Sequence, residues 1–96
     1  MYVLTYEVDL HLPESRSLKA KRALIKPIIE GVRRRYQVAV AEVDHQDTWQ
    51  RAALGIAVVS STPSHCEDVI DQVERFVWSV PEVQVLESRR QWMEEN

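Results

Sequence analysis

The first twelve residues are the part of this sequence that most constrains its fold. Apolar side chains occupy every second position from residue 2 to residue 12, and mostly polar ones stand between them. Since successive side chains of a β-strand point to opposite faces, this period of two predicts a strand with one buried face. Pro13 and the polar residues after it end the pattern. We therefore expect the chain to begin with a strand that covers a core.

The residues after this strand change to a helical period. Apolar side chains from residue 18 to residue 36 recur at spacings near 3.6, which predicts an amphipathic helix. Ser17 is placed to cap it, because its hydroxyl can accept a hydrogen bond from a free amide of the first turn. Pro27 lies inside the pattern, where a proline removes a donor and clashes with the preceding turn at a cost of about 3 kcal/mol. We expect a kink near residues 23–27, and a break into two helices is the alternative.

The second half of the chain predicts a hairpin, a helix and a last strand. Two apolar runs at residues 37–45 and 51–61 are joined by a short polar turn, which favours adjacent antiparallel strands. Thr62 and Pro63 have the residue types of a helix cap and a first helical position. Ser64 with Glu67 is an alternative capping box one register later. Pro81 ends this helix region, a last strand begins at residues 83–86, and we interpret residues 88–96 as a polar, acidic end.

The order of these elements predicts the fold class. Strand, helix, strand, strand, helix, strand is typical of an α+β, ferredoxin-like βαββαβ sandwich, here one domain over residues 1–96. Right-handed crossovers would place the first and third strands in the middle of a four-stranded antiparallel sheet, in the order 4-1-3-2. Both helices would then cover the same face of that sheet.

The opposite face of the sheet is expected to be flat and poor in aromatic rings. Ferredoxin-like domains that bind single-stranded RNA usually stack bases on aromatic side chains of this face, so its composition argues against RNA binding by the sheet. A flat surface of small residues suits close packing of a second copy, which makes a homodimer one hypothesis and a merely solvated face the other. The residues expected there are Ala39, Ala41, Ala53, Gly55 and Ala57, beside Val3, Thr5 and Glu7.

Positive charge is concentrated in one segment, although the net charge of the chain is −3. Residues 14–36 hold eight basic and two acidic side chains, and acids predominate elsewhere. The free amides at the start of the predicted helix and the cations around them could hold an anion or an RNA phosphate. A solvated helix face is the alternative, because the whole chain lacks the high pI of a nucleic-acid binder. The candidate residues are Arg16, Lys19, Lys21, Arg22, Lys26, Arg33, Arg34 and Arg35.

A second candidate site is the polar turn between the two central strands. Neighbouring strand residues such as Asp44 and His45 point to opposite faces, so they cannot share a metal unless a bulge re-aims one of them. We predict no metal, no cofactor, no catalytic residue and no enzymatic activity. Two interpretations remain open: the side chains satisfy turn amides while Trp49 closes the core, or the turn binds a partner. The residues of the second interpretation are Asp44, His45, Gln46, Asp47, Trp49, Gln50 and Arg51.

The sequence also predicts a cytoplasmic protein that does not enter a membrane. Cys66 is the single cysteine and cannot form an intrachain disulfide, which suits a reducing compartment. The apolar runs are far shorter than the roughly 20 residues of a membrane span. The N-terminus opens directly into a strand pattern and does not have the three regions of a signal peptide.

Two segments resemble a known family. SLKAKR at residues 17–22 and VAEVDHQDTWQRA at residues 40–52 are similar to the two signatures of the YlxP-like family of small uncharacterised bacterial proteins, and the similarity extends over essentially the whole chain, including LGIAVVS at 54–60. Ala20 is a departure, since the family often has an acidic residue there, which puts in doubt a role that needs a carboxylate. The resemblance implies a ferredoxin-like fold and a bacterial cytoplasmic protein, frequently encoded beside translation-initiation and ribosome-maturation genes. It implies no activity or cofactor.

These observations lead to three hypotheses of function. The first is a non-enzymatic accessory protein of translation or ribosome assembly that contacts ribosomal RNA or a ribosome-associated protein through its basic helix. The second is a homo-oligomeric protein-interaction module without RNA contact, assembled through the small-residue face of the sheet. The third, which the sequence favours least because it shows no catalytic constellation, is a hydrolase that uses Asp44, His45 and Asp47.

Overall fold

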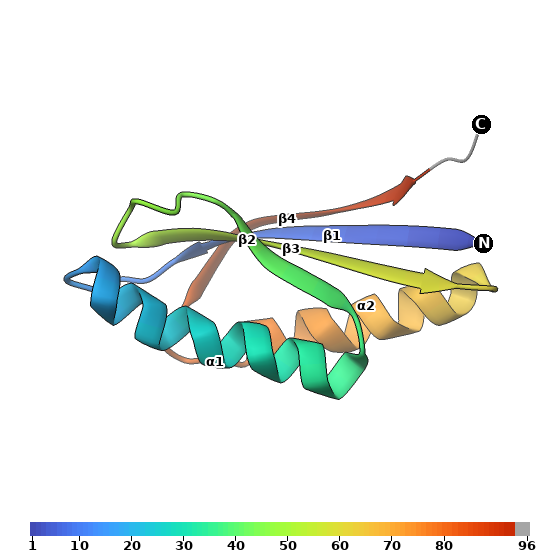
Figure 1. The fold of residues 1–96 in the computed structure, drawn as a ribbon, viewed down its shortest axis with the longest axis horizontal. Coiled ribbons are helices and arrows are strands. Elements are labelled where there is room, and N and C mark those ends of the chain that lie inside the picture. Colours follow the sequence, from blue (N-terminus) through green and yellow to red (C-terminus); the bar gives the residue numbers. More distant parts are fainter. Residues whose placement is uncertain (94–96) are drawn as a thin grey trace.

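The computed structural model describes residues 1–93, which form one sheet and two helices (Figure 1). The elements are β1 (Tyr2–His11), α1 (Leu18–Tyr36), β2 (Ala39–Asp44), β3 (Arg51–Ser60), α2 (Pro63–Trp78) and β4 (Gln84–Met93). The four strands are antiparallel and lie in the order β2-β3-β1-β4. Both helices lie below the same face of the sheet. The predicted α+β fold and the strand order 4-1-3-2, counted from the other edge, are confirmed.

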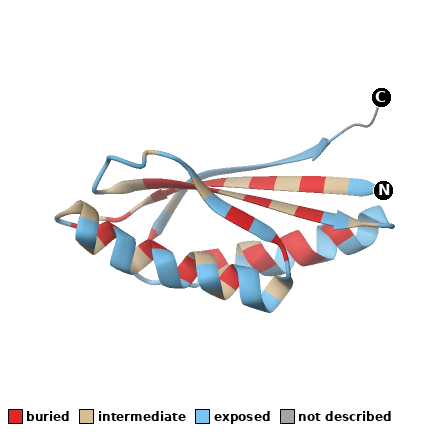
Figure 2. Ribbon diagram, viewed as in Figure 1, coloured by how far each residue is buried: buried red, intermediate tan, exposed pale blue. Residues whose placement is uncertain are grey.

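The core lies between the helices and the two central strands. Buried side chains alternate with more exposed ones along β1 and β3, as the period of two predicts (Figure 2). The buried stripe of α1 and that of α2 close the other side. From the two helices, the core contains Ile25, Ile28, Val32, Cys66, Val69, Ile70, Val73 and Val77.

Both helices begin where their caps predict. The Ser17 hydroxyl accepts a hydrogen bond from the Ala20 amide at 3.0 Å, and the Thr62 hydroxyl accepts one from the His65 amide at 3.3 Å. The alternative cap at Ser64 is therefore wrong. Because α1 runs unbroken from residue 18 to residue 36 with Pro27 inside it, the alternative of two separate helices is also wrong.

The last strand is longer than the sequence predicts. Residues up to Met93 pair with β1, so the interpretation of residues 88–93 as a polar end is wrong; residues 94–96 lie outside the part that the structure describes. The pattern hid this strand for two reasons. β4 is an edge strand, most of which is exposed. A bulge also shifts its register, since Leu10 pairs with Val85 but Asp9 pairs with Glu87.

The bulge decides which way each residue of β4 faces. Before the bulge, Val83 and Val85 point toward the core. After the extra residue, Leu86, the even-numbered residues are the ones that face the helices. Arg90 there lies 2.8 Å from carboxylate oxygens of both Asp71 and Glu74 on α2. Burial alone would lower the pKa of the Arg90 guanidinium, but these two carboxylates more than offset it and the pKa is raised.

In residues 1–93, no helix is long and apolar enough to cross a membrane.

Candidate functional site

Lys21 joins the two sequence segments that were predicted to be functional. Its side chain is only 2% exposed, and its Nζ lies 2.7 Å from Glu42 Oε2 on β2. The same Nζ donates a hydrogen bond of 2.5 Å to the carbonyl oxygen of His45 in the β2–β3 turn. The start of α1 and the polar turn are therefore one unit. Lys21 is also removed from the predicted phosphate-binding set, because a buried and paired amine cannot reach a ligand in solvent.

The turn itself contains an unusual backbone conformation. His45 has φ 63°, in the left-handed region, which costs a residue with a side chain about 1–2 kcal/mol. Its amide donates to Asp44 Oδ1 at 2.7 Å, and its carbonyl accepts from both the Thr48 amide and Lys21. A register shift in β2 between Glu42 and Asp44 precedes this turn. These contacts hold the strained conformation in place.

The side chain of His45 turns back toward the sheet. Its Nε2 lies 3.6 Å from Asp9 Oδ1 on β1 and 3.5 Å from Arg51 Nη2 on β3. Arg51 Nη2 in turn lies 3.8 Å from Asp9 Oδ2. This contact to β1 was missed in the sequence, because nothing there places Asp9 opposite the turn. Within the described part of the chain, no three His, Cys, Asp or Glu side chains gather as metal ligands would.

Gln50 and Trp49, adjacent in sequence, have different surroundings. Gln50 Nε2 donates to the carbonyl oxygens of Pro13 and Ser15, each at 3.2 Å, so it fixes the loop between β1 and α1. Trp49 is 53% exposed and does not close the core, which makes that part of the structural interpretation wrong. Asp44, Gln46 and Asp47 are also exposed. The turn therefore presents one large ring within a polar, mostly acidic surface.

Four of the remaining bases of α1 lie on one side of the helix, with the exposed Glu30 beside them. At about 100° per residue, Lys19, Arg22, Lys26 and Arg33 fall within roughly 60° of the helix circumference and span about 21 Å of its length. All four are exposed, and none makes an ion pair with another residue of the described chain. We define these four residues as the basic stripe. On the strands, by contrast, Arg51, Arg89 and Arg90 each lie within 4 Å of a carboxylate oxygen.

The other predicted bases lie outside the stripe. Arg35 packs over the Phe76 ring with its guanidinium carbon 4.8 Å from the ring centroid. Arg34 is exposed farther round the helix, and Arg16 is exposed in the loop before it. A groove of about 300 Å³ runs between α1 and the edge strand β2, beside the stripe. Its walls combine Arg22, Lys26 and Arg33 with Ile25, Ile29, Lys21, Glu30 and Glu42.

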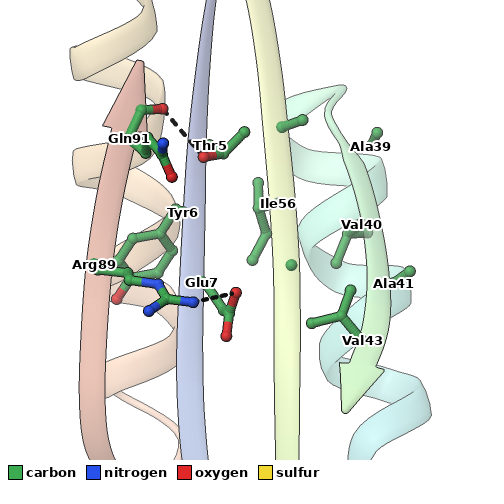
Figure 3. A pocket seen from close by; sticks show the side chains of 12 residues that line it. Thr5, Tyr6, Glu7, Ala39, Val40, Ala41, Val43, Ile56, Arg89 and Gln91 are labelled. Carbon is green, nitrogen blue, oxygen red and sulfur yellow. Dashed lines mark hydrogen bonds and ion pairs between the residues drawn. The ribbon is translucent and has the colours of Figure 1, made fainter. Parts of the chain in front are cut away.

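The face of the sheet without helices is hollow rather than flat. A depression of about 370 Å³ lies over the middle of all four strands (Figure 3). Val43 stands over Gly55, where an added Cβ would lie 2.8 Å from Val43 Cγ1, so a larger residue would displace the Val43 side chain. Arg89 Nη2 and Glu7 Oε1, 3.2 Å apart, bound the other side. Ala39, Ala41, Gly55 and Ala57 line the depression as predicted, whereas Ala53 is fully buried and does not line it. The prediction of a flat surface is wrong.

Sequence reasoning missed the β4 side of this hollow. Arg89 and Gln91 line it, and the Thr5 hydroxyl donates to the Gln91 carbonyl oxygen at 3.1 Å. Both residues fall in the segment that was interpreted as a polar end. The only signal for them is the alternation of residues 87–93 after the bulge, which has too few apolar members to stand out.

Comparisons of the sequence with known proteins gave matches over most of the chain. The family described as "Protein of unknown function (DUF503)" matches residues 3–90. The "Uncharacterized protein YlxP" of Bacillus subtilis (strain 168) is 37% identical over 86 residues, which cover 90% of this chain and 94% of that protein.

Solved structures resemble the fold at low sequence identity. The de novo designed protein Foldit4 has a TM-score of 0.57 at 19% identity, with 95% of this chain and 97% of that chain covered. An antibiotic biosynthesis monooxygenase has a TM-score of 0.57 at 14% identity, with 100% and 99% covered. The designed protein LFR1 1, described as having a ferredoxin fold, has a TM-score of 0.55 at 17% identity, with 99% and 88% covered. At these identities the likeness concerns the fold alone.

Proposed function

Because this chain belongs to the DUF503 family of proteins of unknown function, we propose a role from its own surface: it is a non-enzymatic, cytoplasmic accessory protein of translation or ribosome assembly that contacts RNA through α1. The basic stripe carries this proposal. Four cations on one side of a rigid helix, without carboxylate partners in residues 1–93, form a surface suited to a phosphate backbone.

The rest of the surface supports contact through the helix rather than the sheet. The hollow of the open face lacks exposed rings, since Tyr6 is the only aromatic residue at it and its side chain is fully buried. Trp49, in contrast, is exposed in the turn that Lys21 ties to the start of α1. A ring at this position can stack on an unpaired base beside the phosphates that the stripe binds.

The test is RNA binding measured as a function of salt. A structured ribosomal RNA fragment is titrated with the wild-type protein and with a Lys19→Ala, Arg22→Ala, Lys26→Ala triple variant. Each lost phosphate contact lowers the salt slope by about 0.7–0.9, so we expect the slope to fall by about 2–3 and the affinity at low salt to fall at least about 100-fold.

A matched control uses a base outside α1. Arg75→Ala on α2 removes an exposed charge, and we expect it to leave the affinity within about twofold. Absence of binding by the wild-type protein at low salt would overturn the proposal. Equal salt slopes for the wild type and the triple variant would do the same.

The two other hypotheses have less support. A protein-interaction module assembled through the sheet face would have to fit the depression and the standing Val43 rather than a flat surface. For the hydrolase, His45 Nε2 faces Asp9 and Arg51, and the Asp44 carboxylate is used by the His45 amide. Neither is proposed.

A further inference from the structure

The two edges of the sheet differ in how open they are to another strand. β2 has only six residues, its register is interrupted before Asp44, and Arg33 Nη2 donates to the outward-facing carbonyl of Val40 at 3.2 Å. Such features protect an edge against pairing with another chain. β4 has ten residues and no strand beyond it in the described chain (Figure 1). The β4 edge is thus the open one.

The backbone groups that β4 offers can be identified. The Thr5 hydroxyl reaches the Gln91 carbonyl, so this carbonyl faces β1. Because N–H and C=O directions alternate along an antiparallel strand, Arg89 also faces β1, while Ser88 and Arg90 direct their amides and carbonyls away from the sheet. A second antiparallel strand would form its hydrogen-bonded pairs with these outward residues.

The side chains next to Ser88 select one register. Glu87 and Arg89 flank it on the open face, and within residues 1–93 Glu87 makes no ion pair. If Ser88 lies opposite Ser88 of a second copy, Glu87 of each copy lies opposite Arg89 of the other. A shift of the second copy by two residues in either direction also keeps the outward amides and carbonyls hydrogen-bonded. One of these two registers places Glu87 opposite Glu87, and the other places Arg89 opposite Arg89. Opposite charges across strands are favourable and like charges unfavourable, so the charges discriminate between these registers.

We propose that a second copy of this chain pairs with the β4 edge, antiparallel and centred on Ser88, so that two sheets become one of eight strands. The same patch then serves both copies, as in an isologous two-fold dimer. Charged side chains on an edge strand normally prevent pairing with another chain, but Glu87 and Arg89 complement the same two residues of a second copy. The basic stripe lies beside β2, at the opposite edge of the sheet, so this dimer leaves it accessible and does not depend on the proposed RNA contact.

Charge reversal tests the register. In sedimentation equilibrium at low salt, we expect the wild-type chain to self-associate at tens of micromolar. Glu87→Arg alone and Arg89→Glu alone each place like charges opposite one another, and each should weaken association about tenfold. Combining both substitutions in one chain restores opposite charges, and so does mixing the two single variants in equal amounts. Association within about threefold of the wild type is expected in both cases.

Two controls keep the test specific. The midpoint of thermal unfolding of each variant shows that the fold is kept, which matters because Arg89→Glu also removes the contact with Glu7. Ala41→Trp fills the depression on the open face and should leave association unchanged. A wild-type chain that is monomeric at about 100 µM, or no recovery on mixing the single variants, would overturn the proposal. So would loss of association in Ala41→Trp with no effect of Glu87→Arg, since the second copy would then sit on the sheet face.

Discussion

Lys21 is the residue on which the geometry of the candidate site depends. Lysines are rarely fully buried unless they are paired, and this one uses Glu42 and the His45 carbonyl to satisfy its charge. Since Glu42 lies on β2 and His45 directly follows this strand, the amine fixes where the turn leaves the sheet. The positions of Trp49 and of the basic stripe are thereby set relative to each other.

Replacing this lysine should be costly for stability. Lys21→Met keeps most of the buried stem but leaves the Glu42 carboxylate and the His45 carbonyl without their donor, so we expect a loss of about 2–3 kcal/mol in the free energy of unfolding. The value can be measured by urea denaturation. Lys19→Met is the matched control on the exposed side and should change stability by less than about 0.5 kcal/mol. Equal midpoints for the two variants would contradict the structural role of Lys21.

Only the helical period of the sequence could have predicted that Lys21 is buried while its basic neighbours are exposed. Lys21, Ile25, Ile28 and Val32 are spaced by four, three and four residues, which puts the lysine on the buried side of α1. Residue type gave no hint, because Lys19 and Lys21 are chemically alike. The burial of one and the exposure of the other come from the strand that packs over the helix, and sequence does not position that strand.

At the level of elements, α1 is continuous despite an interior proline. Pro27 is the tenth of its nineteen residues, is exposed, and cannot donate the hydrogen bond that a helix interior requires. The burial of Ile25, Ile28 and Val32 against the sheet maintains the helix through this defect.

Pro27→Ala should therefore stabilise the protein. It restores one backbone donor and removes the clash with the preceding turn, and we expect a gain of about 2 kcal/mol, or an increase of roughly 10 °C in the melting temperature. Differential scanning calorimetry gives both values. A lower melting temperature would contradict the expectation that Pro27 costs stability.

The elements differ in how far sequence predicted them. β1 and β3 each keep one face against the helices, so their alternation is clear and their boundaries were found within a residue or two. Both caps were found because capping chemistry is local, as at Ser17 and Thr62. β4 was truncated because its apolar alternation stops at the bulge and because hydrogen bonding to β1, rather than burial, holds its second half. A tertiary contact of that kind leaves little trace in composition.

At the scale of the whole molecule, the buried core contains one tyrosine that can ionise. Tyr6 is fully buried, and its hydroxyl has no hydrogen-bond partner in the described residues. Burial raises the pKa of the Tyr6 phenol above 10.0, because the charged form would lose its hydration. The folded state thus holds this proton more tightly than the unfolded state does.

Global stability should accordingly depend on alkaline pH through Tyr6. The contribution of its raised pKa is fully present below pH 10, the unfolded value, and is lost as the pH rises from there toward the folded value. Tyr6→Phe cannot titrate. Near neutral pH the variant should lie within about 1 kcal/mol of the wild type, and above pH 10 it should become relatively more stable. Guanidinium denaturation of both proteins across this range provides the comparison, and parallel curves would contradict it.

The bulge residue Leu86 determines which neighbours the adjacent Arg89 and Arg90 have. With Leu86 outside the regular ladder, Arg89 turns to the bare side of the sheet and meets Glu7, while Arg90 turns below it and meets Asp71 and Glu74. Without the bulge, the two arginines would exchange faces of the sheet. Arg90 would lose its contacts with Asp71 and Glu74, and Arg89 would point toward α2. Deletion of Leu86 would instead leave each arginine on its present face, with its present neighbours. Deleting this residue should therefore disturb the contacts of β4 less than a one-residue shift of either arginine would.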